Sequence, residues 1–237
     1  PLVGDNVEIE ILDEENRIGN IINIYDRENE LIRPAVSNIS QALVVFAIAN
    51  PMPNLNLLDR FLVMMERNGI DTIICFNKID LVDEEEILKL RDIYVKAGYH
   101  VMFTSTKENM GIEEVLRVID GKTTAFAGPS GVGKSSLLNA LIPEANSQTG
   151  EISEKIKRGK HTTRHTEIFN VSDDTYLMDT PGFSSLYVND FEKEELKDYF
   201  REFIEYNDGC RFTGCVHVNE PDCLVKEAVE NGEISQS

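Results

Sequence analysis

A glycine-rich octapeptide carries the most specific chemistry in this sequence. Residues 128–135 read GPSGVGKS and match the pattern G-x-x-x-x-G-K-[ST] in full. Its glycines let backbone N–H groups turn inward around phosphate oxygens, at the positive end of the next helix. We expect Lys134 to reach the β- and γ-phosphates of a nucleotide and Ser135 to bind Mg²⁺. The predicted nucleotide-binding residues of this loop are Gly128, Ser130, Gly131, Val132, Gly133, Lys134, Ser135 and Ser136.

A second motif predicts which base is bound. Asn77, Lys78 and Asp80 belong to the tetrapeptide NKID, which resembles the guanine-specificity motif of GTPases. The Asp80 carboxylate can accept both guanine N1–H and the exocyclic amine, whereas adenine offers no matching pair of donors. The stem of Lys78 would lie along the ring face. A polar turn after a strand is the alternative for this tetrapeptide alone, but beside a phosphate loop it favours guanine.

Further along the chain, the segment TST resembles the loop that backs the base in GTPases, although its second position departs from the usual alanine. It adds Thr104 and Ser105 to the predicted nucleotide-binding residues.

Two later segments predict a magnesium site and a γ-phosphate sensor. The sequence DTPG matches the D-x-x-G element of GTPases, in which Asp179 would hold Mg²⁺ through water and the Gly182 amide would sense the γ-phosphate. Residues 159–164, GKHTTR, offer a threonine hydroxyl that would complete the Mg²⁺ shell. Thr162 and Thr163 are both candidates, and Thr163 is slightly favoured.

The residue after the DTPG element bears on the rate of hydrolysis. Phe183 stands where Ras-like enzymes carry the glutamine that orients the attacking water. Phenylalanine cannot do this, so intrinsic hydrolysis is expected to be slow unless another group helps. His161 is our candidate because imidazole forms hydrogen bonds near neutral pH; His165 is a rival, and a solvated loop histidine is an equal alternative. The predicted catalytic set is Lys134, His161 and Thr163.

Cysteines crowd near the carboxyl end. Cys210, Cys215, His217 and Cys223 have the spacing C-x4-C-x-H-x5-C. In a chain without a recognisable secretion signal, such a cluster indicates metal binding before disulfides. Three thiolates and one imidazole form a closed ligand set suited to structural zinc, and free thiols are the alternative. Cys75 lies in an apolar strand and is expected to pack in the core.

The elements that must position these residues alternate between strands and helices. Strand patterns are followed by helical spacing several times, and the strands are continuous apolar runs rather than alternating ones. Such a pattern predicts an α/β fold with a mainly parallel sheet covered on both faces. Two apolar bursts at 7–11 and 18–24 predict a β-hairpin. The predicted strands are 43–49, 72–76, 101–103, 123–127, 167–171 and 176–178, and the predicted helices 55–67, 84–97, 111–119 and 134–141.

The order of the motifs is unusual. In most GTPases the phosphate loop comes first and the guanine motif fourth, whereas here Asn77 precedes Gly128 and Asp179. The same site can be assembled if the old termini are joined and the chain is opened elsewhere. The fold is therefore predicted to be a circularly permuted P-loop GTPase fold, in which residues 179–183 lead directly into the carboxyl-terminal module.

Composition narrows the partners. The 237 residues are 41% hydrophobic and carry 23 Lys and Arg against 42 Asp and Glu, a net charge of −19. No apolar run approaches the roughly 20 residues that span a bilayer. Nucleic-acid binders are usually basic, so charge alone argues against RNA or DNA. A local basic segment, residues 155–164, could offset this.

Taken together, the permuted NKID, P-loop, GKHTT and DTPG order and the cysteine cluster resemble the ribosome small-subunit-dependent GTPase A family over nearly the whole chain. This resemblance implies an OB-fold barrel, of which residues 1–33 would be the truncated last part, a GTPase domain at 34–190 and a truncated, helical zinc-binding domain at 191–237. It implies GTP hydrolysis stimulated by the 30S subunit, contact with 16S rRNA, and a late role in maturing that subunit. The implied cofactors are GTP or GDP, Mg²⁺ and Zn²⁺; we expect a cytoplasmic monomer without DNA or membrane partners.

Two other functions compete with this one. In the first, a non-enzymatic scaffold binds RNA and the nucleotide is only structural; Phe183 keeps that alternative open. In the second, a P-loop ATPase or nucleotide kinase would accept ATP readily.

Overall fold

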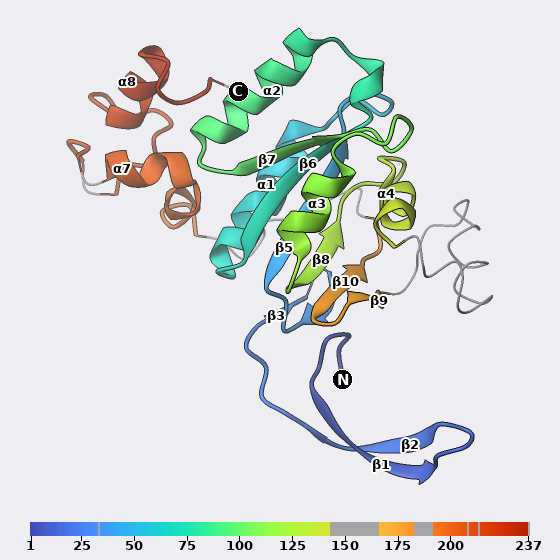
Figure 1. Ribbon diagram of the computed structural model, residues 1–237. Coiled ribbons are helices and arrows are strands. Elements are labelled where there is room, and N and C mark those ends of the chain that lie inside the picture. The colour runs from blue at the N-terminus through green and yellow to red at the C-terminus, as the bar shows by residue number, and fades with distance from the viewer. Residues whose placement is uncertain (33, 143–165, 183–191, 208, 213, 237) are drawn as a thin grey trace.

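A computed structural model describes residues 1–32, 34–142, 166–182, 192–207, 209–212 and 214–236 (Figure 1). The predicted His161, His165, Thr162, Thr163 and Phe183, and the basic segment 155–164, lie outside these residues. Within the described part, no helix is both long enough and apolar enough to cross a membrane.

A six-stranded sheet forms the centre of the molecule, in the order β7-β6-β5-β8-β10-β9. All neighbours in it are parallel except the edge strand β9, which runs antiparallel to β10. Every residue of β5 is buried, as a strand covered on both faces requires. The predicted α/β class and mainly parallel sheet are confirmed. The strands are β5 (Gln41–Ala47), β6 (Asp71–Asn77), β7 (His100–Thr104), β8 (Thr123–Ala127), β9 (Glu167–Ser172) and β10 (Thr175–Asp179).

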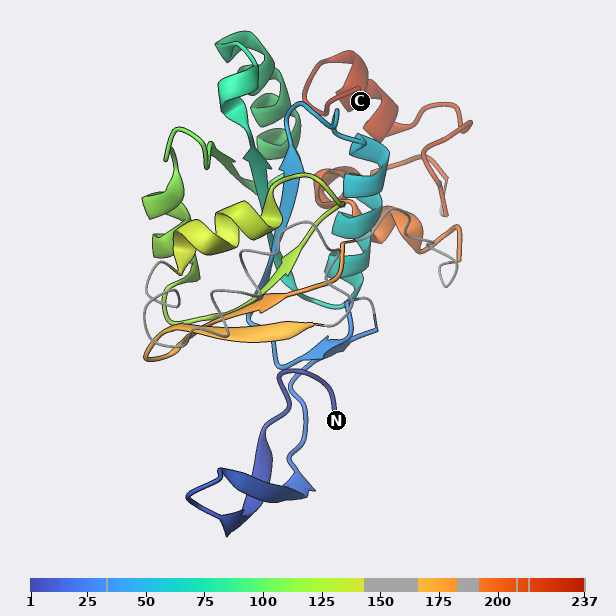
Figure 2. The same cartoon turned by 90° about the vertical axis from the view of Figure 1, so that its right-hand side faces the viewer.

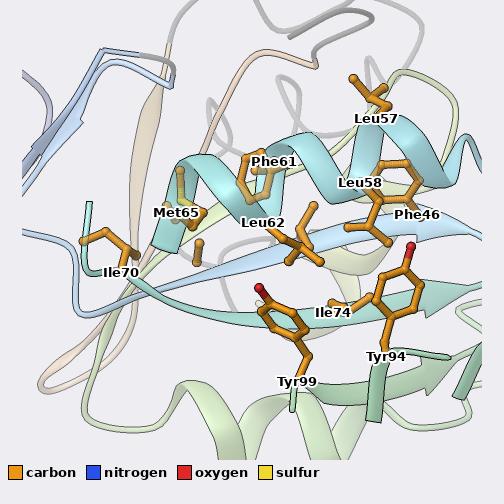
Figure 3. Close-up of a cluster of buried hydrophobic side chains, with 14 of the residues drawn as sticks. Phe46, Leu57, Leu58, Phe61, Leu62, Met65, Ile70, Ile74, Tyr94 and Tyr99 are labelled. Carbon is orange, nitrogen blue, oxygen red and sulfur yellow. The ribbon is translucent and has the colours of Figure 1, made fainter. Parts of the chain in front are cut away.

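Helices cover both faces of this sheet. Helices α1 (Leu55–Arg67) and α2 (Glu84–Lys96) pack on one face, in a cluster that includes Phe46 and Phe76 (Figure 3). Helices α3 (Ile112–Ile119) and α4 (Lys134–Leu141) pack on the other face, around Phe126 and Cys75. Cys75 is fully buried in this cluster, which confirms its predicted packing role. The same burial raises the pKa of its thiol to about 12.

Two of these helices begin at polar caps. The Asn54 side chain accepts a hydrogen bond from the Leu57 N–H at 3.1 Å, and Asp83 accepts one from the Glu86 N–H at 3.1 Å. Each cap satisfies a backbone donor that has no partner inside the helix.

The predicted amino-terminal hairpin is confirmed as β1 (Val7–Asp13) paired antiparallel with β2 (Ile18–Ile24). It extends away from the sheet in both views (Figures 1 and 2). In the described residues β1 and β2 pair only with each other, and apolar side chains such as Ile11 (63% exposed) face solvent. The OB-fold barrel stays a prediction.

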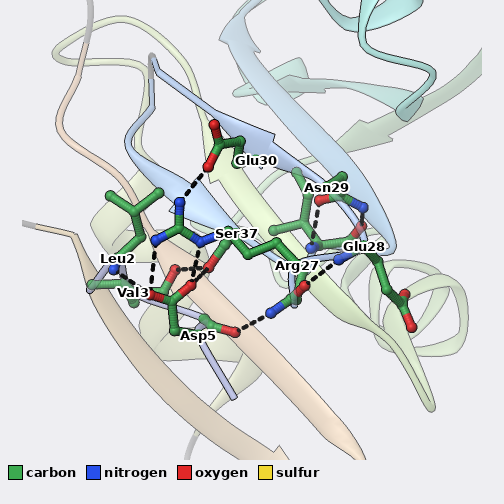
Figure 4. A network of polar contacts seen from close by, with 11 residues as sticks. Leu2, Val3, Asp5, Arg27, Glu28, Asn29, Glu30 and Ser37 are labelled. Carbon is green, nitrogen blue, oxygen red and sulfur yellow. Dashed lines mark hydrogen bonds and ion pairs between the residues drawn. The ribbon is translucent and has the colours of Figure 1, made fainter. Parts of the chain in front are cut away.

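A polar network joins this hairpin to the body of the protein (Figure 4). The Asp5 carboxylate accepts hydrogen bonds from the Arg27 guanidinium at 2.7 and 3.0 Å, from the Ser37 hydroxyl at 2.7 Å and from the Leu2 N–H at 2.6 Å. These bonds lower the pKa of Asp5, and the bond from Arg27 has the largest effect. The network includes Glu30 and Ser37, which belong to the short strands β3 (Glu30–Leu31) and β4 (Val36–Ser37). These two strands pair across the predicted domain boundary at residue 33.

The carboxyl-terminal segment forms a small helical module around a third hydrophobic cluster. Its members include Cys215, Cys223 and Ile234. Arg201 joins the module to the body, because its guanidinium lies 2.7 Å from Glu66 of α1 and over the Tyr99 ring. The helices are η2 (Leu196–Tyr199), η3 (Arg201–Phe203), α7 (Ile204–Asn207) and α8 (Leu224–Glu230).

Replacing Asp5 should test the polar network. We expect Asp5→Asn to lower the melting temperature at pH 7, because the amide loses the charge that Arg27 and Ser37 satisfy. Because the pKa of Asp5 is lower in the folded state, its stabilisation of the fold is fully present at pH values above the ordinary aspartate pKa of about 3.9. This stabilisation is lost as the pH falls through the folded-state pKa. Thermal melts at pH 7 and pH 3 should show the difference from wild type shrinking at low pH. Asp26→Asn, at an exposed position nearby, should melt as wild type at both pH values; a pH-independent Asp5→Asn effect would contradict this account.

Candidate functional site

The predicted motifs meet at one edge of the sheet because parallel strands end on the same side. Strand β6 ends at Asn77, β7 at Thr104 and β10 at Asp179, and the phosphate loop comes directly after β8. Ligands of open α/β sheets bind at this carboxyl edge. The structure therefore brings together motifs that are distant in the chain.

The Asn77 side chain links the base motif to the phosphate loop. Its Nδ2 donates to the Val132 carbonyl at 3.0 Å, and its Oδ1 accepts from the Thr104 hydroxyl at 3.1 Å. Asn77 and Thr104 are fully buried, so these bonds are made without competition from water. Three segments of the site are thereby held in register by one carboxamide.

Asp80 is held in an orientation suited to accept hydrogen bonds. The Ser105 hydroxyl donates to Asp80 Oδ1 at 2.7 Å and in turn accepts from the Glu108 N–H at 3.1 Å. Lys107 Nζ lies 3.4 Å from the other carboxylate oxygen. These contacts lower the pKa of Asp80 and keep it ionised, and the bond from Ser105 has the largest effect. The predicted Asp80 and Ser105 therefore lie together. Lys107, which the sequence analysis did not single out, directly follows the TST segment, and the motif could have identified it there.

Lys78 contacts the phosphate loop directly. It adopts the left-handed backbone conformation (φ +68°), and its ammonium donates to the Gly131 carbonyl at 2.8 Å and to the Asn50 carbonyl. Residue 50 belongs to the connection between β5 and α1. The lysine that we expected along the base thus also ties that connection to the loop, a contact that the motif alone does not predict.

The phosphate loop needs glycine at two positions for steric reasons. Gly128 has φ +147°, and a Cβ there would lie 2.1 Å from the Val45 carbonyl oxygen. Gly133 has φ +97°, and a Cβ there would lie 2.4 Å from Asn77 Nδ2. The close approach of Gly133 to Asn77 is what allows the base motif and the loop to share one site.

Lys134 and Gly182 face each other across the loop. Lys134 Nζ donates to the carbonyls of Gly128 at 2.7 Å and Pro129 at 2.9 Å. Burial lowers its pKa, and nearby Asp179 opposes that shift. A Cβ on Gly182 would lie 3.2 Å from Lys134 Nζ and 3.3 Å from the Ser130 amide nitrogen. The Gly182 backbone therefore closely approaches an ammonium and a backbone amide, the two kinds of group that are expected to hold a phosphate.

The remaining predicted residues of the loop and the DTPG element also lie at this edge. Ser135 and Ser136 occupy the first turn of α4, and Asp179 is buried at the end of β10. Thr180, which the sequence analysis did not single out, donates its hydroxyl to the Phe126 carbonyl at 2.7 Å. This bond fastens the DTPG element to the strand that precedes the phosphate loop.

The predicted metal ligands converge. One ligand atom each from Cys210, Cys215, His217 and Cys223 lies within 4.8 Å of the others. His217 Nδ1 is 3.7, 3.4 and 3.2 Å from the three sulfur atoms in that order. Such separations suit a tetrahedral ion with Zn–S bonds of about 2.3 Å. The other ring nitrogen, Nε2, lies 2.9 Å from Asn207 Oδ1, the kind of outer partner that orients a ligand histidine.

Glu220 shapes the loop between these ligands. Its carboxylate accepts from the N–H groups of Val216, Val218 and Asn219, each at 3.0 Å. These bonds, with that of Val216 first, lower the pKa of Glu220 to about 2, so the group stays charged at neutral pH. Neither Asn207 nor Glu220 has a fixed spacing from the cysteines that sequence analysis could use.

The mainly parallel sheet, the phosphate loop and a base motif that precedes it in the chain define a circularly permuted P-loop GTPase. The chain belongs to the RsgA GTPase family, whose family model matches residues 24–189.

Known proteins with high similarity cover this whole chain. It is 60% identical over 236 residues to the small ribosomal subunit biogenesis GTPase RsgA of Agathobacter rectalis and 52% identical over 237 residues to that of Alkaliphilus metalliredigens; it covers 78% and 81% of those proteins. The crystal structure of YjeQ from Thermotoga maritima matches with a TM-score of 0.79 at 41% identity, and YloQ, described as a circularly permuted GTPase, with 0.76 at 38%. Both structures match 100% of this chain, over 80% and 76% of their own length.

Removing the Thr104 hydroxyl should loosen the joint between the base motif and the phosphate loop. We expect Thr104→Val to lower the free energy of unfolding by about 1–3 kcal/mol, because it leaves a buried acceptor on Asn77 unpaired. GDP affinity should fall several-fold as the loop loses its register. Urea unfolding and calorimetric titration with GDP would measure the two effects. Thr106→Val, two residues away and partly exposed, is the control; equal effects of the two substitutions would exclude a special role for Thr104.

Proposed function

We propose that this chain hydrolyses GTP to GDP and phosphate at the carboxyl edge of its sheet, as a maturation factor of the small ribosomal subunit. The observation that carries the site assignment is the Asn77 carboxamide, which bonds to both the phosphate loop and the strand end that leads to Ser105. This contact supports the assignment of Asp80 and Lys134 to one binding site.

Each predicted group has a role that its surroundings support. Asp80, kept ionised by Ser105, would accept the N1–H and amine of guanine. Lys134 and the N–H groups of the loop would hold the phosphates, and Gly182 would report the γ-phosphate. Ser135, Thr163 and Asp179 would hold Mg²⁺, which supplies charge neutralisation at the phosphates when it is bound.

Hydrolysis is proposed to be slow in the isolated protein. Phe183 cannot orient water, and the candidates His161 and Thr163 belong to a segment between the phosphate loop and β9 outside the described residues. Switch segments of GTPases are ordered by the γ-phosphate, so a partner that orders this segment would raise the rate. His165 and Thr162 remain the alternatives.

The proposed partner is the 30S subunit through its 16S rRNA. Support comes from the relatives, which are named small ribosomal subunit biogenesis GTPases. The position of the DTPG element immediately before the carboxyl-terminal module gives a short covalent path from the γ-phosphate sensor to that module. With a ribosomal partner the proposed location is the cytoplasm, and the proposed oligomeric state is a monomer.

We also propose that Cys210, Cys215, His217 and Cys223 bind one structural Zn²⁺. The convergence of four ligand atoms, the orientation of His217 by Asn207 and the burial of Cys215 and Cys223 support this assignment. Four protein ligands leave no open position, so the ion would stabilise the module rather than catalyse a reaction.

GTP turnover with and without purified small ribosomal subunits tests the proposed function. We expect turnover to rise about tenfold or more with subunits, because partner-stimulated GTPases complete their sites in this way. Asp80→Asn should weaken GTP binding roughly 100-fold, because the NH₂ group of asparagine would face the N1–H and the amine of guanine, which are also hydrogen-bond donors. Asp92→Asn, an exposed carboxylate on α2, should bind GTP normally.

The outcomes separate the competing functions. Turnover unaffected by subunits would favour a scaffold in which the nucleotide is structural. Effective competition by ATP, or unchanged GTP affinity in Asp80→Asn, would overturn the guanine assignment.

Metal analysis of the purified protein tests the zinc site. We expect about one zinc per chain, because the site offers one closed set of four ligands. Cys215→Ser should lose most of the metal and lower the melting temperature of the module. Cys75→Ser alters a buried cysteine outside the cluster and should keep its zinc. A wild-type protein purified in zinc-containing medium yet lacking the metal would refute the assignment.

A further inference from the structure

A cavity that contains none of the motif residues lies where the carboxyl-terminal module meets helices α1 and α2. About 530 Å³ there is not filled by protein atoms, a volume that includes open solvent. Tyr94 and Tyr99 stand beneath α1 with their hydroxyl groups directed toward that helix (Figure 3). Tyr199 and Phe200 of the module close the other side. Four aromatic side chains therefore line one cavity between two parts of the protein.

Two carboxylates also line this cavity, one from each part. Asp59 comes from α1 and Glu202 from η3 of the module. Burial raises the pKa of both groups, so each carboxylate is poorly solvated. Asp59 accepts a hydrogen bond from the Tyr94 hydroxyl at 3.0 Å, but among the described residues neither carboxylate has a cationic partner.

The nearest cations are engaged elsewhere. Arg201 pairs with Glu66 at 2.7 Å and stacks on the ring of Tyr99. Lys96 pairs with Asp92 at 2.9 Å and donates to the Gly232 carbonyl at 3.3 Å. Lys96 also lines the cavity, but its ammonium pairs with Asp92 and not with Asp59 or Glu202. Two partly desolvated carboxylates thus share the cavity without an ion pair among the described residues, an arrangement that favours a positively charged ligand.

The walls indicate which kind of cation fits. Aromatic faces attract ammonium groups through their quadrupoles, and the apolar Leu62 and Val63 suit an alkyl chain. A divalent metal ion would need six or more oxygen ligands in most cases. In the described part of the chain, the cysteine–histidine cluster alone brings three or more metal-ligand side chains together.

We propose that this cavity binds an alkylammonium group, carried by a free polyamine or by a lysine side chain. The ammonium lies between Asp59 and Glu202 and is enclosed by the tyrosines, and the attached chain runs along the apolar wall. Because one carboxylate belongs to the body and the other to the module, the bound cation draws the two parts together and removes the repulsion between the carboxylates.

Calorimetric titration of the full, nucleic-acid-free chain tests this site, with spermidine and a neutral-capped lysine peptide as separate probes. At 0.15 M salt, where surface attraction is screened, we expect saturable binding of at least one probe. Asp59→Asn and Glu202→Gln should each weaken it about tenfold, because each amide keeps the shape and removes one charge. Glu85→Gln changes the net charge equally at an exposed position on α2 and should bind as wild type.

Melting temperatures of the cavity variants show whether weaker binding results from a loss of folding. Without ligand, both cavity variants should melt at or above the wild-type temperature, since each removes a charge that burial penalises. The probe that binds more tightly identifies the source of the ammonium group. Binding of neither probe, or equal loss in Glu85→Gln, overturns the proposal, as does undiminished binding in both cavity variants.

Discussion

The site depends on the hydrogen bonds of the Asn77 carboxamide. Asn77 lies 55 residues from Val132 and 27 from Thr104, yet its side chain bonds to both. A carboxamide can donate and accept at once, so one buried group satisfies a loop carbonyl and a strand-end hydroxyl together. Because the link is not covalent, it does not depend on the order in which the three segments occur in the chain. A permuted chain can therefore build the same site as an unpermuted one, provided the strands keep their neighbours.

The sheet supplies that condition. Strands β5, β6, β7, β8 and β10 are parallel, so their carboxyl ends form one edge whatever their order in the sequence. Asp179 lies opposite Phe126 in the register of β10 and β8, and Thr180 bonds to the Phe126 carbonyl through its hydroxyl. The DTPG element, for which we propose a sensing role, is thus fixed to the strand that leads into the phosphate loop. Permutation changes which segment the chain enters after this element, and here that segment is the carboxyl-terminal module.

Local chemistry explains which elements could be predicted from the sequence. Helices 55–67 and 134–141, predicted from the spacing of their residues, have their predicted bounds, and in the structure a polar cap at Asn54 and the glycine before Lys134 mark where they begin. The position of the phosphate loop could be predicted from its motif because Gly128 and Gly133 stand where the structure leaves no room for a side chain. Contacts without a recognisable sequence pattern could not be found in this way. Glu220 bonds to backbone groups of its own loop, and Asp5 meets Arg27 across 22 residues; neither pairing has a periodicity or a spacing that identifies it.

An acidic chain and a polyanionic partner are compatible when charge is considered locally. The net charge of −19 is a sum over the whole chain, but at physiological salt a charge acts over about 8 Å. Acidic groups on α2, such as Glu85 and Asp92, pair with lysines one turn along, which reduces the net charge of that helix. The cations of residues 155–164 are concentrated in ten positions that precede β9 in the sequence. Phosphate binding at such a segment is governed by the charges within a screening length, so the total charge limits the partner far less than the position of the lysines and arginines does.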